Sequence, residues 1–171
     1  MNASVVFMGV AGCGKSSLGA AVANALGLPL VEGDDFHSPE SRAKMAQGIA
    51  LTDDDRDGWL TRLGQELQHH LNGTSQGAVL TCSALKLGYR QRLRAAVPGL
   101  RFVFLDIGRA DAQARVAARS AHFFSASLID SQFATLEVPT GEPGVLRGDA
   151  LAPLPQLQTQ VSTWLQSGEA T

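Results

Sequence analysis

The sequence predicts a single α/β domain in which a parallel β-sheet is covered by helices on both faces. Segments typical of strands alternate with segments typical of helices, which is the order that a parallel sheet with crossover helices requires. Several strand segments are almost entirely apolar, as strands buried on both faces are. The 171 residues show no internal repeat, low-complexity tract or linker, and this length suits one core rather than two ordinary domains.

The elements follow from the apolar spacing and from the residues that start and stop each segment. The helix predicted over 54–71 is the clearest, because its apolar residues recur every three or four positions. Thr52 or Asp53 would cap its start, where further acids suit the helix dipole. Strands are predicted over residues 4–8, 28–31, 77–82, 101–107 and, weakly, 145–146. The other helices are predicted over residues 15–26, 39–47, 87–96, 110–119 and 155–165, and residues 120–144 break the alternation.

Composition favours a globular protein of the cytoplasm. Apolar residues make up 44% of the chain and charged residues 18%, which are globular values. A net charge of −2 gives no electrostatic attraction to nucleic acid or to an anionic membrane. Cys13 and Cys82 lie in no metal-binding spacing and are expected to be reduced thiols. No apolar stretch reaches the roughly 20 residues of a membrane span, and the N-terminus lacks the features of a signal peptide.

A glycine-rich motif lies between the first strand and the first helix. In GVAGCGKSS, Gly9, Gly14, Lys15 and Ser16 fit the pattern G-x-x-x-x-G-K-[ST]. Such glycines let backbone N–H groups surround phosphate oxygens, and the helix N-terminus adds partial positive charge. Lys15 would reach the β- and γ-phosphates, and Ser16 would hold Mg²⁺. A chance match in a glycine-rich turn is the alternative, but the flanking strand and helix argue against it.

An acidic stretch, VEGDDFHSPE, stands where the second strand ends. Ligands of open α/β sheets lie beyond the carboxyl ends of the strands, and phosphoryl transfer needs a carboxylate that orients the attacking hydroxyl. Asp34 is the candidate for this role, and Glu32 would bind Mg²⁺ through water. His37 would hydrogen-bond a substrate hydroxyl or, alternatively, cap the following helix. Asp35 is expected to be a solvated residue or a cap.

Three further clusters would reach the same space. Lys44 lies on the next helix, Arg56 lies among acids in LTDDDRDGW, and Lys86 and Arg90 follow the third strand. That strand tip has no aspartate, which favours an acid of the preceding tip as the magnesium carboxylate. Carboxylates and histidine accept hydrogen bonds from hydroxyls, whereas lysine and arginine bind anions. A hydroxylated acid is therefore the substrate that fits best; a nucleoside monophosphate would need an apolar slot for its base, which the sequence does not reveal.

Two arginines precede the break in the alternation. Arg115 and Arg119 are four residues apart and share one helix face. Such a pair would stack on a nucleotide base and neutralise the transferring phosphate, and residues 120–140 would close over the site and exclude water. The alternative is a surface helix with two solvated arginines.

These stretches resemble the small P-loop gluconokinases, which are related to shikimate kinases and more distantly to adenylate kinases. The resemblance rests on GVAGCGKSS, GDDFHSPESRAKMAQGIALTDDDRDGWL, TCSALKLGYRQRLR and RSAHFF…QFATLEVP, which span roughly residues 5–139. It implies ATP-dependent phosphorylation of D-gluconate at its 6-hydroxyl. It further implies a three-layer P-loop kinase fold with a five-stranded parallel sheet, a lid at about residues 120–140, and commonly a homodimer.

The resemblance also implies roles for the matching residues. Lys15, Asp34 and Arg119 would be catalytic, with Asp34 as the base, and Ser16 and Glu32 would hold Mg²⁺. The nucleotide would contact Gly9, Gly12, Gly14, Lys15, Ser16, Ser17, Arg115 and Arg119. The gluconate would contact Asp34, His37, Lys44, Arg56, Lys86 and Arg90. Two other readings stay open, namely a kinase for another hydroxy-acid such as shikimate and a regulatory module that binds ATP without turnover.

This sequence departs from the family pattern in two places. Ser120 and Ala121 stand where relatives often carry a charged residue and a glycine, which affects the closing contacts of the lid. The last strand segment, VLRGDALAP, is short and polar, so the adenine-side loop near residues 149–153 is the least defined part of the expected site.

Overall fold

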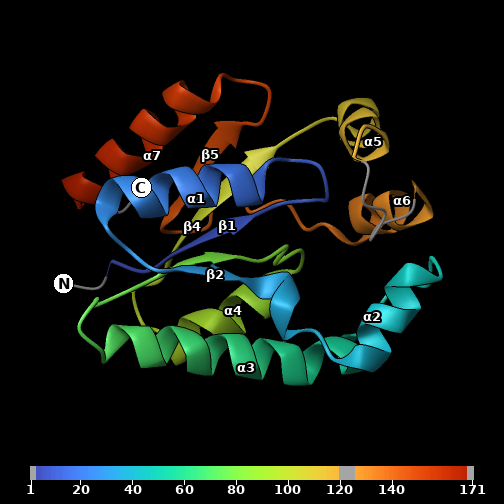
Figure 1. Ribbon diagram of the computed structural model, residues 1–171, viewed down its shortest axis with the longest axis horizontal. Helices are drawn as coiled ribbons and strands as arrows, with labels where there is room; N and C mark the ends of the chain where they lie inside the picture. The colour runs from blue at the N-terminus through green and yellow to red at the C-terminus, as the bar shows by residue number, and fades with distance from the viewer. Residues whose placement is uncertain (1–2, 120–125, 169–171) are drawn as a thin grey trace.

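The computed structural model describes residues 3–119 and 126–168, and in them a parallel sheet lies between two layers of helices (Figure 1). The strand order is β2-β3-β1-β4-β5, and every neighbouring pair is parallel. The strands are β1 (Val5–Met8), β2 (Leu30–Glu32), β3 (Val79–Thr81), β4 (Arg101–Asp106) and β5 (Val145–Asp149). The predicted α/β class and the five-stranded parallel sheet are confirmed.

Helices cover both faces of this sheet. They are α1 (Lys15–Leu26), α2 (Pro39–Ala46), α3 (Asp53–Leu71), α4 (Leu87–Ala96), α5 (Arg109–Ala117), α6 (Ala126–Thr135) and α7 (Leu154–Ser167), with a 3₁₀ helix η1 (Gly33–Phe36) after β2. Helices α1 and α7 lie together on one face, and α3 and α4 lie together on the other (Figure 1). None of the helices in the described ranges combines the length and apolar character that crossing a bilayer requires.

The central strand β1 shows why the strand segments are continuously apolar. All four of its side chains are fully buried. Val5 and Phe7 pack in the cluster formed with α1 and α7, whereas Val6 and Met8 pack in the cluster formed with α3 and α4. Because successive side chains of a strand point to opposite faces, a strand covered on both sides has no position for a polar residue.

Local capping explains where the functional helices begin. Thr52 caps α3 in a capping box, since its hydroxyl accepts a hydrogen bond from Asp55 N (3.1 Å) while the Asp55 carboxylate accepts one from Thr52 N (2.9 Å). Helix α1 instead begins after Gly14, which has left-handed φ and makes no side-chain cap. The first N–H groups of α1 are therefore left without a side-chain cap at the carboxyl edge of the sheet.

The structure corrects two expectations for the second half of the chain. Residues 126–135, predicted to be irregular, form helix α6; residues 120–125, including the Ser120 and Ala121 departure in the predicted lid, lie outside the described ranges. The weak strand over 145–146 is the five-residue strand β5, paired with β4 from Val145 to Asp149. It is an edge strand, whose polar residues such as Arg147 reach solvent and disguise the strand pattern.

Candidate active site

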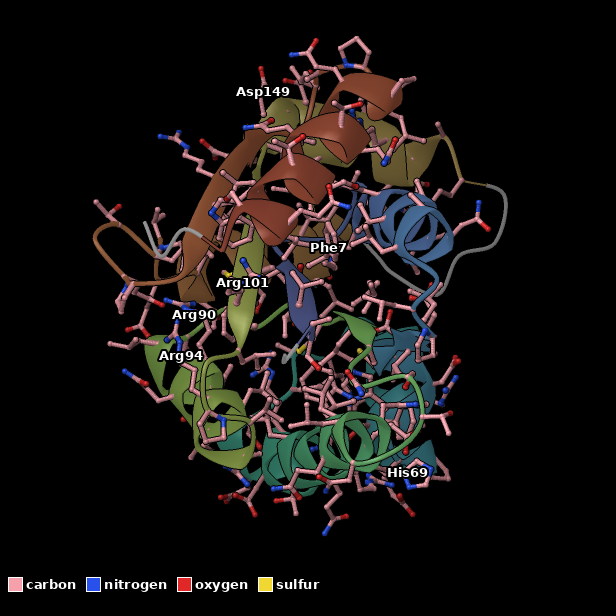
Figure 2. All side chains as sticks on the ribbon, turned by 90° about the vertical axis from the view of Figure 1, so that its left-hand side faces the viewer. Phe7, His69, Arg90, Arg94, Arg101 and Asp149 are labelled. Carbon is pink, nitrogen blue, oxygen red and sulfur yellow. The ribbon has the colours of Figure 1, made fainter. Side chains whose placement is uncertain are left out.

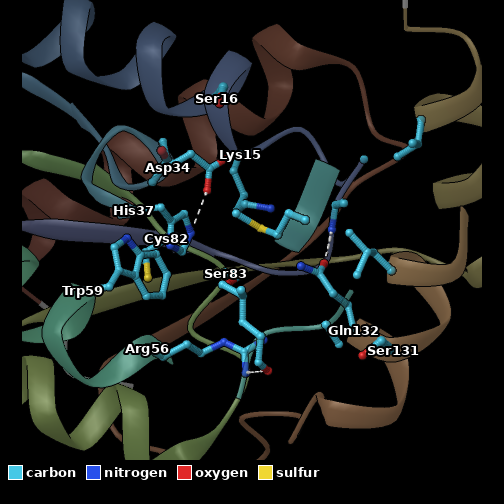
Figure 3. Close-up of a pocket in the computed structure, with 18 of the residues that line it drawn as sticks. Lys15, Ser16, Asp34, His37, Arg56, Trp59, Cys82, Ser83, Ser131 and Gln132 are labelled. Atoms are coloured by element: carbon cyan, nitrogen blue, oxygen red, sulfur yellow. Dashed lines mark hydrogen bonds and ion pairs between the residues drawn. The ribbon is translucent and has the colours of Figure 1, made fainter. Parts of the chain in front are cut away.

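A cavity opens at the carboxyl edge of the sheet, between the glycine-rich loop and helices α2, α3 and α6 (Figure 3). Eight residues that the sequence singled out line it: Gly12, Gly14, Lys15, Ser16, Asp34, His37, Arg56 and Arg119. They come from segments that are distant in the chain and meet because parallel strands end at the same edge. The other predicted site residues, Gly9, Ser17, Glu32, Lys44, Lys86, Arg90 and Arg115, do not line the cavity.

The glycine-rich loop has the backbone geometry of a phosphate cradle. Gly12 and Gly14 have positive φ angles of 82° and 96°, which side-chain-bearing residues rarely adopt. A Cβ on Gly12 would also lie only 2.8 Å from the carbonyl oxygen of Ala112, so no larger residue fits there. The Lys15 ammonium donates to the carbonyl oxygens of Gly9 and Val10, both at 3.0 Å. The loop is thus curled around its own cation.

Three oxygen-bearing side chains converge next to this loop. The hydroxyl of Ser16 donates to Glu32 Oε2 (3.1 Å), and the hydroxyl of Thr81 donates to the same oxygen (2.5 Å). Gly33 brings the two strand tips together, since a Cβ on it would lie 2.2 Å from the Thr81 carbonyl oxygen. Hydroxyl and carboxylate oxygens at a phosphate site are the ligands that Mg²⁺ prefers. The residues present therefore fit the predicted ion, and Thr81 adds an oxygen that the sequence did not point to.

The acidic strand tip combines an exposed carboxylate with a buried histidine. Helix η1 carries Asp34, whose side chain is 74% exposed, into the cavity wall (Figure 3). His37 Nε2 lies 3.7 Å from Asp34 Oδ1, which is too far for a hydrogen bond. His37 stacks on Trp59, with ring centroids 4.3 Å apart and planes 17° apart, and the Trp59 N–H donates to the Gly33 carbonyl oxygen (2.7 Å). Trp59, one of the apolar residues of the helix predicted over 54–71, thus supports both the histidine and the strand tip.

The His37 ring is neutral over the ordinary pH range. Burial lowers its pKa to about 4, and the opposing effect of Asp34 is smaller. Nearby Arg42, Arg56 and Arg62 lower the pKa further. His37 Nδ1 is buried and has no hydrogen-bond partner among the described residues. A neutral imidazole of this kind both donates and accepts one hydrogen bond, as recognition of a hydroxyl requires.

The predicted substrate cations occupy different positions. Arg56 lines the cavity while donating to the Leu51 carbonyl oxygen (2.8 Å) and to the Tyr89 hydroxyl (3.3 Å). Lys44 is paired with Asp55 (2.9 Å), and Lys86 is paired with Asp53 (3.1 Å). The acids at the start of α3, attributed to the helix dipole, therefore also hold two of the predicted substrate lysines.

The pKa values of these two acids reflect their contacts. Hydrogen bonds from the Thr52 backbone and then from Lys44 lower the pKa of Asp55 to about 2. Hydrogen bonds from Tyr89 and Lys86 lower the pKa of Asp53. Both carboxylates are consequently ionised at neutral pH, and the ion pairs with the lysines persist there.

Arg90 is not brought to the cavity, contrary to its expected place beside the substrate. Its side chain is 1% exposed and donates to the carboxylate of Glu142, to Ala84 O (2.7 Å) and to Glu137 O (2.9 Å). Arg94 also donates to Glu142 (3.0 Å), and the two arginines lie together on α4 (Figure 2). Burial raises the pKa of Glu142, but the hydrogen bonds from both arginines outweigh burial and keep that pKa below its ordinary value. Arg90 is therefore a buried structural cation. Its partner Glu142 lies 52 residues away in the sequence, so sequence spacing gives no signal of the pair.

On the nucleotide side, Arg115 ties the phosphate loop to the segment after β5. Its guanidinium donates to Gly12 O (3.2 Å) and to Ala150 O (2.8 Å). Arg119 lines the cavity, whereas Ser17 is exposed on α1 and Gly9 is buried beneath the loop. The nucleotide roles of these residues stay predictions.

Helix α6 supplies a wall that the sequence did not predict. Leu128, Ser131 and Gln132 line the cavity. Leu128 packs with Met45 and Leu51 across the cavity, and the Gln132 side-chain oxygen accepts a hydrogen bond from Ala11 N (2.7 Å). The stretch QFATLEVP lay within the predicted lid of residues 120–140, but none of its residues was assigned to the site.

Comparisons with known proteins identify the family. Residues 11–129 match the shikimate kinase family. The gluconokinase of Gluconobacter oxydans (strain 621H) is 42% identical over 143 residues, which are 84% of this chain and 80% of that protein. The thermosensitive gluconokinase of Escherichia coli (strain K12) is 38% identical over 139 residues, covering 81% and 74%. This chain belongs to the gluconokinase family.

Solved structures agree with this family membership. The crystal structure of a gluconokinase from Sinorhizobium meliloti 1021 gives a TM-score of 0.86 at 42% identity and covers 96% of this chain and 91% of that chain. A sugar kinase from Janibacter sp. HTCC2649 gives a TM-score of 0.90 at 39% identity and covers 96% and 95%. The resemblance stated from the sequence is thereby confirmed, and so is the P-loop kinase fold.

Proposed function

We propose that this member of the gluconokinase family transfers the γ-phosphoryl group of ATP to the 6-hydroxyl of D-gluconate, giving 6-phospho-D-gluconate and ADP. One observation carries the proposal: the phosphate loop with Lys15 and the exposed carboxylate of Asp34 line the same cavity. Phosphoryl transfer requires these two parts to face one substrate pair. Curated gluconokinases at 34–42% identity over most of the chain support gluconate as the acceptor.

The reaction follows from the chemistry of these residues. Lys15 exchanges the Gly9 and Val10 carbonyl oxygens for phosphate oxygens, while the loop N–H groups hold the nucleotide. Asp34 accepts a hydrogen bond from the 6-hydroxyl, orients its oxygen for in-line attack and takes its proton. The new bond joins that oxygen to the γ-phosphorus, and the bond from the phosphorus to the ADP oxygen breaks. Positioning and charge neutralisation supply most of the rate enhancement.

Gluconate offers a row of hydroxyls and one carboxylate. Neutral His37 suits a hydroxyl, because its imidazole both donates and accepts a hydrogen bond. Of the four cations predicted to contact the gluconate, Arg56 is the one that lines the cavity. We assign it to the carboxylate of gluconate. Lys44 and Lys86 would join it only by exchanging their contacts with Asp55 and Asp53.

We further propose that Mg²⁺ accompanies the nucleotide and is held by Ser16 and Glu32. Their oxygens lie 3.1 Å apart beside the phosphate loop. The ion would neutralise charge on the β- and γ-phosphates. A lid over residues 120–140 that directly follows Arg119, a cytoplasmic location and a homodimer also belong to this proposal, with the family resemblance as their support. Sedimentation of the purified chain at several concentrations tests the dimer.

A second candidate is a kinase for a related hydroxy-acid such as shikimate, favoured by the match of residues 11–129 to the shikimate kinase family. A regulatory ATP-binding module is less favoured, since it has no need of a carboxylate such as Asp34 in its nucleotide cavity. To test the proposed function, the product formed from MgATP and D-gluconate is analysed by phosphorus and carbon NMR. A phosphate ester at carbon 6 supports the proposal, whereas an ester at another carbon or no ester contradicts it.

A further inference from the structure

Helix α6 reaches the phosphate loop through a single side chain. Gln132 Oε1 accepts a hydrogen bond of 2.7 Å from the backbone N–H of Ala11 (Figure 3). The two residues are 121 positions apart in sequence, and both line the cavity together with Lys15 and Asp34. Gln132 therefore lines the same cavity as the Lys15 cation and the Asp34 carboxylate.

The Ala11 contact fixes which way the Gln132 carboxamide faces. A backbone N–H is a donor only, so the atom opposite it must be the carboxamide oxygen. The NH₂ group of Gln132 is then turned away from the loop, and it has no hydrogen-bond acceptor among the described residues. Two N–H donors are thus left for a ligand in a cavity where a phosphate is expected.

Helix α6, which carries Gln132 and lies within the proposed lid of residues 120–140, is anchored on three sides in this structure. Ile129 is buried in the core cluster formed with α1 and α7, and Phe133 packs against the same cluster. Leu128 packs on Met45 and Leu51, and Asp130 accepts a hydrogen bond from Arg109 (3.0 Å). A side chain on a helix held in this way is preorganised, and fixed donors of this kind stabilise developing charge well.

We propose that Gln132 donates a hydrogen bond to the γ-phosphoryl group of the bound nucleotide, with its carboxamide oriented by Ala11. Gln132 then distinguishes ATP from ADP and stabilises the phosphoryl group during transfer. This role rests on ATP as the phosphoryl donor of the proposed function, but not on the identity of the acceptor.

Binding of two nucleotides tests this role without any turnover. Calorimetry in the presence of Mg²⁺ compares ADP with a non-hydrolysable β,γ-imido analogue of ATP. Gln132→Ala should bind the analogue about tenfold more weakly, at the low end of the contribution of a hydrogen bond to a charged group. Its ADP affinity should change less than about twofold, because the α- and β-phosphates are held by other loop N–H groups. Retained ADP binding also shows that the variant is folded.

Gln132→Glu separates the two ends of the carboxamide. Glutamate keeps an oxygen for Ala11 N–H but replaces the donor NH₂ by a second negatively charged oxygen, so it should weaken the analogue at least as much as alanine does. Gln113→Ala is the matched control: Gln113 lies on α5 and donates to Asp130 (3.3 Å) at an exposed site. It should leave both affinities unchanged. In turnover, both Gln132 variants should lower kcat by roughly 10²-fold, as removal of one charge-stabilising donor does.

Three results would overturn the role of Gln132. If Gln132→Glu binds the analogue as tightly as the parent does, Gln132 only anchors the loop and donates no hydrogen bond to the phosphate. Equal weakening of ADP and the analogue would mean that it shapes the whole loop, and tighter binding of both would mean that it blocks Ala11 N–H. If the parent binds nucleotide but does not phosphorylate gluconate, the proposed acceptor is wrong, while the nucleotide comparison still decides the role of Gln132.

Discussion

Replacing Arg90 by alanine should destabilise the fold and leave substrate recognition largely intact. The guanidinium makes five hydrogen-bond contacts, three with Glu142 and one each with the carbonyl oxygens of Ala84 and Glu137. Alanine would leave both carbonyl oxygens without this donor and would leave Glu142 with Arg94 as its remaining arginine partner. The side chains of Arg90 and Glu142 are 1% and 13% exposed, so solvent can replace little of what is lost.

The magnitude follows from this burial. Removing one partner of a buried ion pair costs about 3–5 kcal/mol of unfolding free energy, against a total of about 5–15 kcal/mol for an ordinary domain. For a domain of this size the melting temperature falls by about 2–4 °C per kcal/mol, which gives a decrease of about 6–20 °C. Urea unfolding followed by circular dichroism measures the free energy, and thermal melts measure the temperature.

Arg92 on the same helix provides a matched control. Its ion pair with Asp57 is solvent-exposed, with side chains 40% and 73% exposed, and such pairs contribute about 0–1 kcal/mol. Arg92→Ala should therefore change stability little. If Arg90→Ala has parental stability but a raised KM for gluconate and an unchanged KM for ATP, the buried-pair explanation is wrong and Arg90 reaches the substrate.

Three further predictions concern the cavity. Asp34→Asn should lower kcat by roughly 10²–10⁴-fold, as loss of a general base does, with ATP-analogue affinity retained; near-parental kcat in a coupled ADP assay would remove Asp34 from its assigned role. Lys15→Ala should weaken ATP-analogue binding in calorimetry, because no other ammonium lines the described cavity; unchanged affinity and turnover would contradict the phosphate cradle. Burial lowers the pKa of His37 to about 4 from 6.5, so the unfolded chain binds the proton first and stability should fall as the pH drops from about 6.5 to about 4. In His37→Gln, the urea midpoint should fall less than in the parent as the pH drops across this range. Identical pH profiles of parent and variant would refute the burial effect.

The parts of the fold that the sequence predicted are those with local signals. Helices α1 and α4 have the bounds expected from apolar spacing and stop residues. Helix α6 was missed because its apolar residues lie on two faces: Ile129 is buried in the core and Phe133 packs against it, whereas Leu128 lines the cavity beside Ser131 and Gln132. Its apolar pattern is therefore weaker than that of a helix with solvent on its other side.

The same distinction applies to the site. The sequence pointed to Lys15, Asp34 and Arg56 because each stands in a short motif or at a strand tip, and all three line the cavity. The Arg90–Glu142 pair and the Ala11–Gln132 contact join residues 52 and 121 positions apart. No spacing rule brings such partners together, so only the three-dimensional structure separates a buried structural arginine from a substrate arginine.

Phosphorylation of D-gluconate by MgATP is tested most directly by ADP release with a panel of acceptors: D-gluconate, shikimate, glucose, glycerate, AMP and no acceptor. The proposed chemistry predicts rapid ADP release with D-gluconate, little with the other compounds, and loss of the gluconate-dependent rate in Asp34→Asn. Faster release with shikimate or another acceptor would keep the kinase chemistry and overturn the substrate. Absence of release with every acceptor, with ATP still bound, would contradict phosphoryl transfer itself.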